Sequence, residues 1–205
     1  MYKKRSLFIT FEGIEGSGKS YQSRKLFNKI KKMKLPVIHT REPGGTKLAE
    51  FLRNLILKIK SDINIEEEIL MLMAARSHHI NNIIKPALDK GSLVISDRFA
   101  DSTFVYQGHV NNFGIQKAKS LHKNILNNFL PHKTFLFNLS TSKIIARLKN
   151  RRSKNKYDKL ERNFHDQVNR GYELISKNKR FIKIDASKSI SSINKKIINT
   201  INLLI

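Results

Sequence analysis

The sequence predicts an α/β fold in which a five-stranded parallel sheet carries helices on both faces. Short apolar runs alternate along the chain with longer stretches of helical periodicity, and this alternation is typical of parallel sheets covered by crossover helices. A glycine-rich loop lies between the first apolar run and the first helical stretch. No internal repeat or Gly/Ser/Pro-rich linker divides the 205 residues, so we expect a single domain over residues 1–205.

The N-terminal half is expected to supply three strands and three helices. Strands are predicted at 6–13, at 36–40 and at 92–98, because each is a short apolar run bounded by glycine, proline or charged residues. Helices are predicted at 19–34, 47–59 and 65–88, and Pro86 is expected to kink or break the last one. The side chains assigned to the buried faces of the first two helices are Leu26, Phe27, Ile30 and Met33, and then Leu48, Phe51, Leu52, Leu55 and Ile56.

The C-terminal half is expected to complete the sheet with strands at 133–140 and 180–187. Helices are predicted at 142–152 and 164–175, separated by the polar, basic segment 153–159, and an amphipathic helix ends the chain. No element is assigned between residues 99 and 132. In a parallel sheet of this kind ligands bind beyond the carboxyl ends of the strands.

Composition limits the classes of protein that fit. There is no cysteine, which excludes disulfides and thiolate metal sites, and no apolar run approaches the roughly 20 residues of a membrane span. We therefore expect a cytoplasmic protein. Lys and Arg number 40 against 16 Asp and Glu, a net charge of +24. This charge suggests either nucleic-acid binding or compositional drift toward Lys, Asn and Ile. The basic residues are scattered, which favours drift, so no specific nucleic-acid partner is expected.

Residues 13–20, GIEGSGKS, match the pattern G-x-x-x-x-G-K-[ST] and are called the phosphate loop below. Glycines let backbone N–H groups face a phosphate, the lysine reaches the outer phosphates, and the serine hydroxyl can ligate Mg²⁺. The loop lies between a predicted strand and a predicted helix, as this mechanism requires. The fold is thus expected to be a three-layer sandwich of P-loop NTPase type. The residues expected to hold ATP are Gly13, Ile14, Glu15, Gly16, Ser17, Gly18, Lys19 and Ser20, and those expected to hold Mg²⁺ are Ser20 and Asp97.

The rest of the chain narrows the class of nucleotide-binding protein. A GTPase would need a guanine-reading N-K-x-D segment directly after a later strand, and residues 137–143, FNLSTSK, which occupy the nearest place, have no such pattern. A small nucleotide kinase fits the length. Such a kinase needs arginines around a second phosphate site and in a lid. TREPGGT at 40–46 follows the second strand, and Arg98 ends the third. Arg53 and Arg76 lie on the following helices.

The motifs FEGIEGSGKS, TREPGGT, LMAAR, SDRFADSTFVYQG and FIKIDAS occur in this order, and with them the whole chain resembles the thymidylate kinase family. The resemblance implies transfer of the ATP γ-phosphate to dTMP, giving dTDP and ADP for dTTP synthesis, with Mg²⁺. It implies that Arg53 and Arg98 hold the dTMP phosphate and bridge to Lys19. It also puts Arg76 against thymine and Tyr106 beside the sugar, with Ser102, Thr103 and Gln107 in the same pocket, and Glu15 near the sugar 3′-OH or the metal.

Several positions depart from the family pattern or distinguish its branches. In the family, a glycine at the position of Gly16 implies that the catalytic arginine comes from a lid, expected here at about 148–162. The candidates are Arg151 and Arg152 within it and Arg147 just before it. Leu72 replaces the phenylalanine that usually stacks on thymine, and Asp158-Lys159 replaces an Asp-Arg pair. Family members form homodimers through helices, and apolar faces around 48–56 and 69–80 are candidates for that interface.

Three alternatives remain open. Leu72 would suit a kinase for another deoxynucleoside monophosphate. The net charge would suit a nucleic-acid-binding protein regulated by ATP. A catalytically silent relative is a third possibility, against which the intact Lys19, Ser20, Arg53, Asp97 and Arg98 argue. His78 and His79 suggest a metal site, but adjacent helix residues point away from each other, so they are interpreted as ordinary helix residues.

Overall fold

A computed structural model of the chain describes residues 6–58, 63–149 and 162–204. Within them, five strands form one sheet in the order β2-β3-β1-β4-β5, and every pair is parallel. The predicted five-stranded parallel sheet is therefore confirmed. The strands are β1 (Leu7–Gly13), β2 (Val37–Arg41), β3 (Leu93–Asp97), β4 (Lys133–Asn138) and β5 (Phe181–Asp185).

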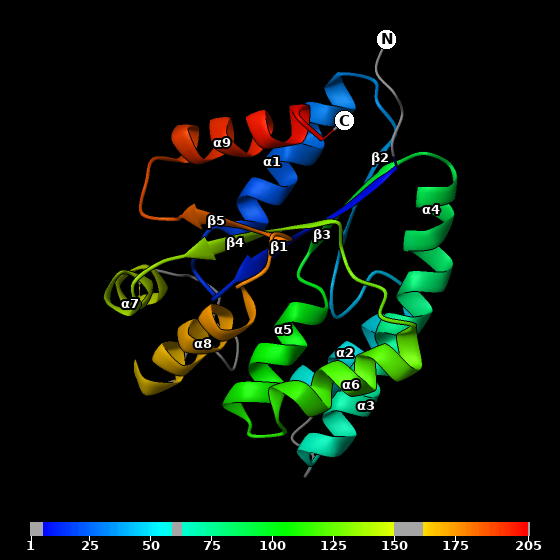
Figure 1. Cartoon of the computed structure of the whole chain (residues 1–205), viewed down its shortest axis with the longest axis vertical. Helices are drawn as coiled ribbons and strands as arrows, with labels where there is room; N and C mark the ends of the chain where they lie inside the picture. Colours follow the sequence, from blue (N-terminus) through cyan, green and yellow to red (C-terminus); the bar gives the residue numbers. More distant parts are fainter. Residues whose placement is uncertain (1–5, 59–62, 150–161, 205) are drawn as a thin grey trace.

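Helices cover both faces of the sheet (Figure 1). Helix α1 (Lys19–Lys32) and helix α9 (Ile190–Asn202) pack together on one face. The other face carries α2 (Lys47–Lys58), α3 (Ile65–His79), α5 (Ala100–Val105), α6 (Ile115–Leu126) and α8 (Arg162–Ile175). Helix α7 (Thr141–Lys149) follows β4 at the carboxyl edge of the sheet. These layers confirm the three-layer sandwich.

Strand β1 forms the centre of the core and is buried along its whole length. The Phe11 ring lies 5.2 Å from the ring of Phe135 and 5.9 Å from that of Phe137, both in the neighbouring strand β4. Phe11 also lies opposite Asp97 in the register of β1 and β3. Because the strands are parallel, the phosphate loop after β1 and Arg98 after β3 emerge at the same edge. The sheet thus brings together two motifs that are more than 70 residues apart in the sequence.

Three apolar side chains that were expected to be buried are exposed. Leu48 and Phe51 on α2 expose 44% and 59% of their surface, because α2 packs on α3 and only Ala49 and Ile56 of its apolar stripe are buried. Met33 is 47% exposed because α1 ends at Lys32 and Met33 is its C-cap residue. The buried-face prediction was wrong at these positions.

The helix predicted at 65–88 continues past Pro86 rather than breaking. After α3 the chain forms a π-helical turn, η1 (Ile80–Ile84), and then α4 (Lys85–Asp89), which has Pro86 in its first turn. A proline lacks an N–H and is tolerated at the start of a helix, and the wider turn before it keeps the path helical. The unassigned stretch 99–132 contains α5, a second π-helical turn η2 (Tyr106–Val110) and α6. No helix in the described part of the chain is long and apolar enough to cross a membrane.

Candidate active site

A cavity of about 450 Å³ lies at the carboxyl edge of the sheet, between the phosphate loop and helices α2, α3 and α5. All the residues predicted to contact the acceptor nucleotide line it: Arg53, Leu72, Arg76, Arg98, Ser102, Thr103, Tyr106 and Gln107. From the predicted ATP site, Glu15, Gly16, Gly18, Lys19 and Ser20 line it too, whereas Gly13, Ile14 and Ser17 are buried in the loop and do not. One cavity therefore combines both predicted phosphate sites.

The phosphate loop is built by glycines in a backbone conformation that other residues rarely adopt. Gly13 has φ +135°, and a Cβ there would lie 2.6 Å from the carbonyl oxygen of Phe137. Gly18, at φ +89°, caps the N-terminus of α1. The hydroxyl of Ser17 is buried and has no hydrogen-bond partner among the described residues. A buried polar atom without a partner carries a free-energy cost, which a bound phosphate in the loop would relieve.

Lys19 begins α1 and is buried, with its Nζ donating to the carbonyl oxygen of Ile14 at 3.3 Å. Burial and then repulsion from Arg98 lower the pKa of Lys19 to about 8, although Glu15 and Asp97 act in the opposite direction. A buried ammonium held by one carbonyl is poorly compensated. A triphosphate would supply the missing negative charge.

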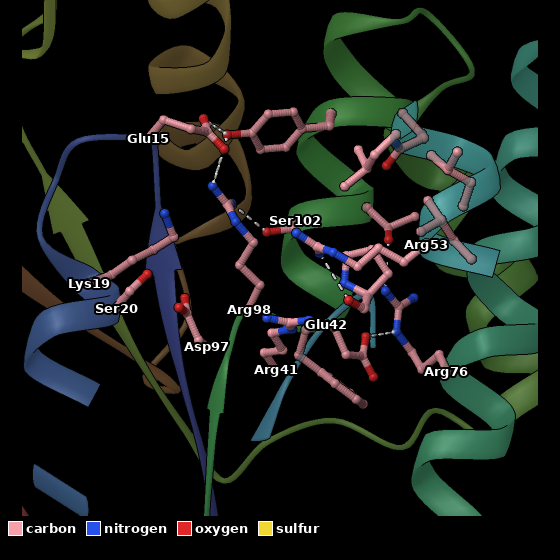
Figure 2. A pocket seen from close by; sticks show the side chains of 18 of the residues that line it. Glu15, Lys19, Ser20, Arg41, Glu42, Arg53, Arg76, Asp97, Arg98 and Ser102 are labelled. Carbon is pink, nitrogen blue, oxygen red and sulfur yellow. Dashed lines mark hydrogen bonds and ion pairs between the residues drawn. The ribbon is translucent and has the colours of Figure 1, made fainter. Parts of the chain in front are cut away.

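Arg98 follows β3 in a left-handed conformation, φ 70°, that aims its guanidinium toward the phosphate loop (Figure 2). It forms an ion pair with Glu15, and its Nη1 donates to Ser102 Oγ at 2.9 Å. Tyr106 also donates its hydroxyl to Glu15 at 2.6 Å. Burial would lower the pKa of Arg98, but Glu15 together with Tyr106, Tyr172 and Glu12 more than offsets it and the pKa is raised. Burial would likewise raise the pKa of Glu15, yet Arg98 and Lys19 outweigh it and lower this pKa.

Arg53 and Arg76 lie on the opposite side of the cavity from Lys19, on α2 and α3 (Figure 2). Arg53 is half-buried, and its Nη1 donates to the carbonyl oxygen of Pro43 at 3.0 Å. Arg76 is buried; its Nε donates to Glu42 Oε2 at 2.7 Å and its Nη2 to Thr103 Oγ1 at 2.8 Å. Burial and then repulsion from Arg41 lower the pKa of Arg53. An anion bound beside Arg53 would offset the repulsion from Arg41.

The lining is cationic overall. Six cationic side chains face four carboxylates: Lys19, Arg41, Arg53, Arg76, Arg98 and Arg147 against Glu15, Glu42, Glu68 and Asp97. Such an excess suits ligands with several negative charges. Leu72 contributes an apolar wall, and Gln107 is held by a 2.6 Å hydrogen bond from its Nε2 to Glu68 Oε1.

The predicted lid falls largely outside the described residues. Arg151 and Arg152 lie there, as do Asp158 and Lys159, so their roles stay predictions. Arg147 lies in the last turn of α7 and is described: its Nη1 donates to the carbonyl oxygen of Gly16 at 3.2 Å and its Nη2 to that of Ala186 at 2.9 Å. This candidate lid arginine therefore lies directly against the phosphate loop.

The family model for thymidylate kinase matches residues 11–197 of the chain. The chain therefore belongs to the thymidylate kinase family. Thymidylate kinases from Mycoplasma capricolum subsp. capricolum and Halothermothrix orenii are 42% and 38% identical over 200 and 196 residues. These matches cover 95% and 94% of the chain and 94% and 95% of the relatives. The crystal structure of thymidylate kinase from Ehrlichia chaffeensis superposes with a TM-score of 0.76 at 31% identity, covering 96% of this chain and 98% of that one.

Sequence analysis missed several residues that support this thymidylate kinase site. Glu12, at the end of β1, accepts hydrogen bonds from Phe99 N at 2.7 Å, Ser102 Oγ at 2.7 Å and Tyr172 Oη at 2.9 Å. Burial, reinforced by Asp101, raises the pKa of Glu12 from 4.5 to about 7. The signal available was an acidic residue inside an otherwise apolar strand. Its partners are 87 to 160 residues away, so no local pattern identified them.

The histidine pair also takes part in the site. The two were interpreted as ordinary helix residues, but both contact the loop after β2. His78 Nδ1 lies 3.0 Å from Thr46 Oγ1, and the buried His79 contacts Thr40 and Glu42. Among the described residues no group of three or more His, Cys, Asp or Glu side chains could hold a metal ion.

Proposed function

We propose that the protein transfers the γ-phosphoryl group of ATP to the phosphate of dTMP, giving ADP and dTDP, for dTTP synthesis. The observation that carries this proposal is that Lys19 of the phosphate loop lines one cavity with Arg53 and Arg98. A donor and an acceptor phosphate bound there would be adjacent. Membership of the thymidylate kinase family supports dTMP as the acceptor.

The reaction needs positive charge more than acid–base groups. The second pKa of a phosphate monoester is about 6, so dTMP is mostly dianionic at pH 7 and needs no general base. One of its phosphate oxygens attacks the γ-phosphorus; that P–O bond forms while the bond to the ADP oxygen breaks. Charge spreads over the transferred group, and preorganised cations stabilise it. Lys19, Arg53 and Arg98 are proposed to do so.

The other lining residues are proposed to position the acceptor. Arg76 and Leu72 would contact thymine, with Ser102, Thr103 and Gln107 beside them. Tyr106 would lie against the sugar and exclude a ribose 2′-OH. Glu15, which already accepts from Tyr106, would contact the sugar 3′-OH.

The donor set fits magnesium. Ser20 and Asp97 both line the cavity near Lys19, and Mg²⁺ is usually held by one or two protein oxygens together with substrate phosphates. Ser20 Oγ and the Asp97 carboxylate would hold it, Asp97 directly or through water. When bound, Mg²⁺ would neutralise part of the triphosphate charge.

The lid and the cellular setting belong to the same proposal. Arg151 and Arg152 would supply the catalytic arginine to ATP, which agrees with Arg147 lying against Gly16. Closure over ATP would exclude water and prevent hydrolysis. We place the enzyme in the cytoplasm.

A homodimer is also proposed. Helices α2 and α3 pack against each other, and each exposes large apolar side chains; Phe51 is 59% and Leu70 54% exposed. Sedimentation should give a dimer for the wild type and a monomer for Phe51→Glu. The control Leu203→Glu, at an 88% exposed position beyond α9, should stay dimeric. A wild-type monomer would contradict this part of the proposal.

The catalytic proposal is tested by variants that keep the fold. Lys19→Met and Arg98→Lys should each lower kcat about a hundredfold or more, since one preorganised cationic donor at a transition state is worth that much and lysine lacks the guanidinium fork. Lys29→Met, at an exposed position on α1, is the matched control and should keep wild-type kcat. Unchanged kcat in Lys19→Met would refute the role of the phosphate loop.

A further inference from the structure

His79 lies in the last turn of α3, with none of its surface exposed, against the loop that follows β2. Its Nε2 is 2.7 Å from Thr40 Oγ1 and its Nδ1 is 3.0 Å from Glu42 Oε1. The ring also packs on Gly45, where a Cβ would lie 2.6 Å from Nε2. One imidazole thus contacts the end of β2, the start of the loop and Gly45.

The two hydrogen bonds determine which nitrogen of the His79 ring donates and which accepts. A carboxylate only accepts, so Nδ1 must carry a proton to bond to Glu42. In the neutral ring, Nε2 then accepts from the Thr40 hydroxyl. The ring is anchored at one nitrogen by Thr40 and orients the Glu42 carboxylate with the other.

Glu42 connects this ring to the acceptor side of the cavity. Its second oxygen, Oε2, accepts from Arg76 Nε at 2.7 Å. The next residue, Pro43, accepts from Arg53 Nη1 at 3.0 Å through its carbonyl oxygen. Two consecutive residues of the loop, Glu42 and Pro43, therefore contact the guanidinium groups of Arg76 and Arg53, and His79 holds Glu42.

We infer that His79 is a positioning residue for the acceptor nucleotide, acting through Glu42 on Arg76 and through the loop on Arg53; the inference rests on the proposed function. His79 itself does not touch the reacting groups. Among the described residues, His79 forms no hydrogen bond with the phosphate loop. Substituting His79 should therefore weaken dTMP binding and leave ATP binding unchanged.

Two substitutions separate the two nitrogens of the ring. In His79→Asn, the amide nitrogen stands two bonds from Cβ, as Nδ1 does, and can still donate to Glu42. In His79→Gln, the amide nitrogen stands where Nε2 did and the donor to Glu42 is lost. Losing a hydrogen bond to a buried charged group is worth about tenfold or more in binding. We expect His79→Gln to bind dTMP at least about tenfold more weakly than wild type, and His79→Asn to stay within about threefold.

The test is dTMP titration calorimetry on the full-length chain without ATP, together with steady-state KM values for dTMP and ATP and the melting temperature. Ile197→Ala, in a buried position of α9 on the other face of the sheet, is the control for lost stability and should keep wild-type dTMP affinity. If His79→Gln does not fold, Thr40→Val keeps the ring and removes only its anchor, a contact that His79→Asn also lacks, and should weaken dTMP binding by about threefold.

The outcomes are distinct. A wild-type protein that binds ATP but not dTMP would overturn the proposed function, and this inference with it. A wild type that binds dTMP while His79→Gln, or Thr40→Val in its place, binds it equally well would overturn the inference alone. Equal weakening of dTMP and ATP binding in His79→Gln would also overturn the inference alone. Weakened dTMP binding in His79→Gln with rescue in His79→Asn supports the inference.

Discussion

Glu12 gives a direct test of how the structure balances buried charge behind the active site. Glu12→Gln is a nearly isosteric change. The amide oxygen can accept from Phe99 N as the carboxylate does, and the amide nitrogen can donate to the hydroxyls of Ser102 and Tyr172, which then act as acceptors. The variant removes the ionisation and keeps the contacts.

The expected effect follows from the raised pKa. Below pH 4.5, Glu12 is protonated in the folded and unfolded states and ionisation costs nothing. Between pH 4.5 and about 7 the unfolded chain releases the proton while the folded protein keeps it, so the free energy of unfolding falls as pH rises. Above about pH 7 the free energy of unfolding shows no further decrease from this group. One pKa unit corresponds to about 1.4 kcal/mol, so the total is about 3 kcal/mol.

Urea denaturation of both proteins at intervals from pH 4.5 to pH 8 measures this directly. The free energy of unfolding of wild type minus that of Glu12→Gln should fall by about 3 kcal/mol over the range. Titrating groups that do not interact with Glu12 are common to both proteins and cancel in the difference. Glu50→Gln is the control, because Arg41 and Gly45 outweigh partial burial and lower the pKa of Glu50 below 4.5; its difference should rise only as pH increases toward 4.5 and should stay nearly constant over the measured range. A flat or rising difference for Glu12→Gln would refute the reasoning.

Three further predictions concern other parts of the site. Gly13→Ala should lower the free energy of unfolding by about 3 kcal/mol or more in urea denaturation, because its Cβ would meet the carbonyl of Phe137. Gly91→Ala, at φ +74° and in open space, should lower it by about 1 kcal/mol, and equal losses would contradict the clash. Leu72→Phe should lower the KM for dTMP about threefold, since ring stacking adds about 0.5–1.5 kcal/mol; a raised KM would show that the pocket has no room for the ring. Asp101→Asn should lower the free energy of unfolding, measured by thermal unfolding, by about 3 kcal/mol, because it removes the buried carboxylate that pairs with Arg180 at 2.7 Å. Unchanged stability would contradict the role of that pair.

The sheet and the phosphate loop were predictable because their signals are local. An apolar strand, a glycine-rich loop and a helix follow one another within residues 6–34, and each has its own pattern. The stretch 100–110 was not assigned because α5 has six residues and η2 is a π-helical turn, too short for a helical period to emerge. The apolar periodicity of α2 correctly predicted a helix. Which of its apolar side chains are buried, however, depends on how α3 packs against it.

The acceptor side was predicted by resemblance, and its supporting residues were not. Arg76 and Arg98 stand in recognisable motifs, and Arg53 lies on the helix that follows TREPGGT. Glu12, Glu42 and His79 are held by partners from other elements, and those contacts exist only once the sheet has formed.

The most direct test of the account is an acceptor panel. ADP release would be measured with Mg²⁺-ATP and dTMP, dUMP, dCMP, dGMP or AMP, with Lys19→Met as the inactive control. We predict kcat/KM for dTMP to exceed that for each other acceptor by at least roughly tenfold, since pocket contacts of this kind discriminate by that much. Equal or higher kcat/KM for another acceptor, or no transfer to any of them by a protein that binds ATP, would contradict the central claim.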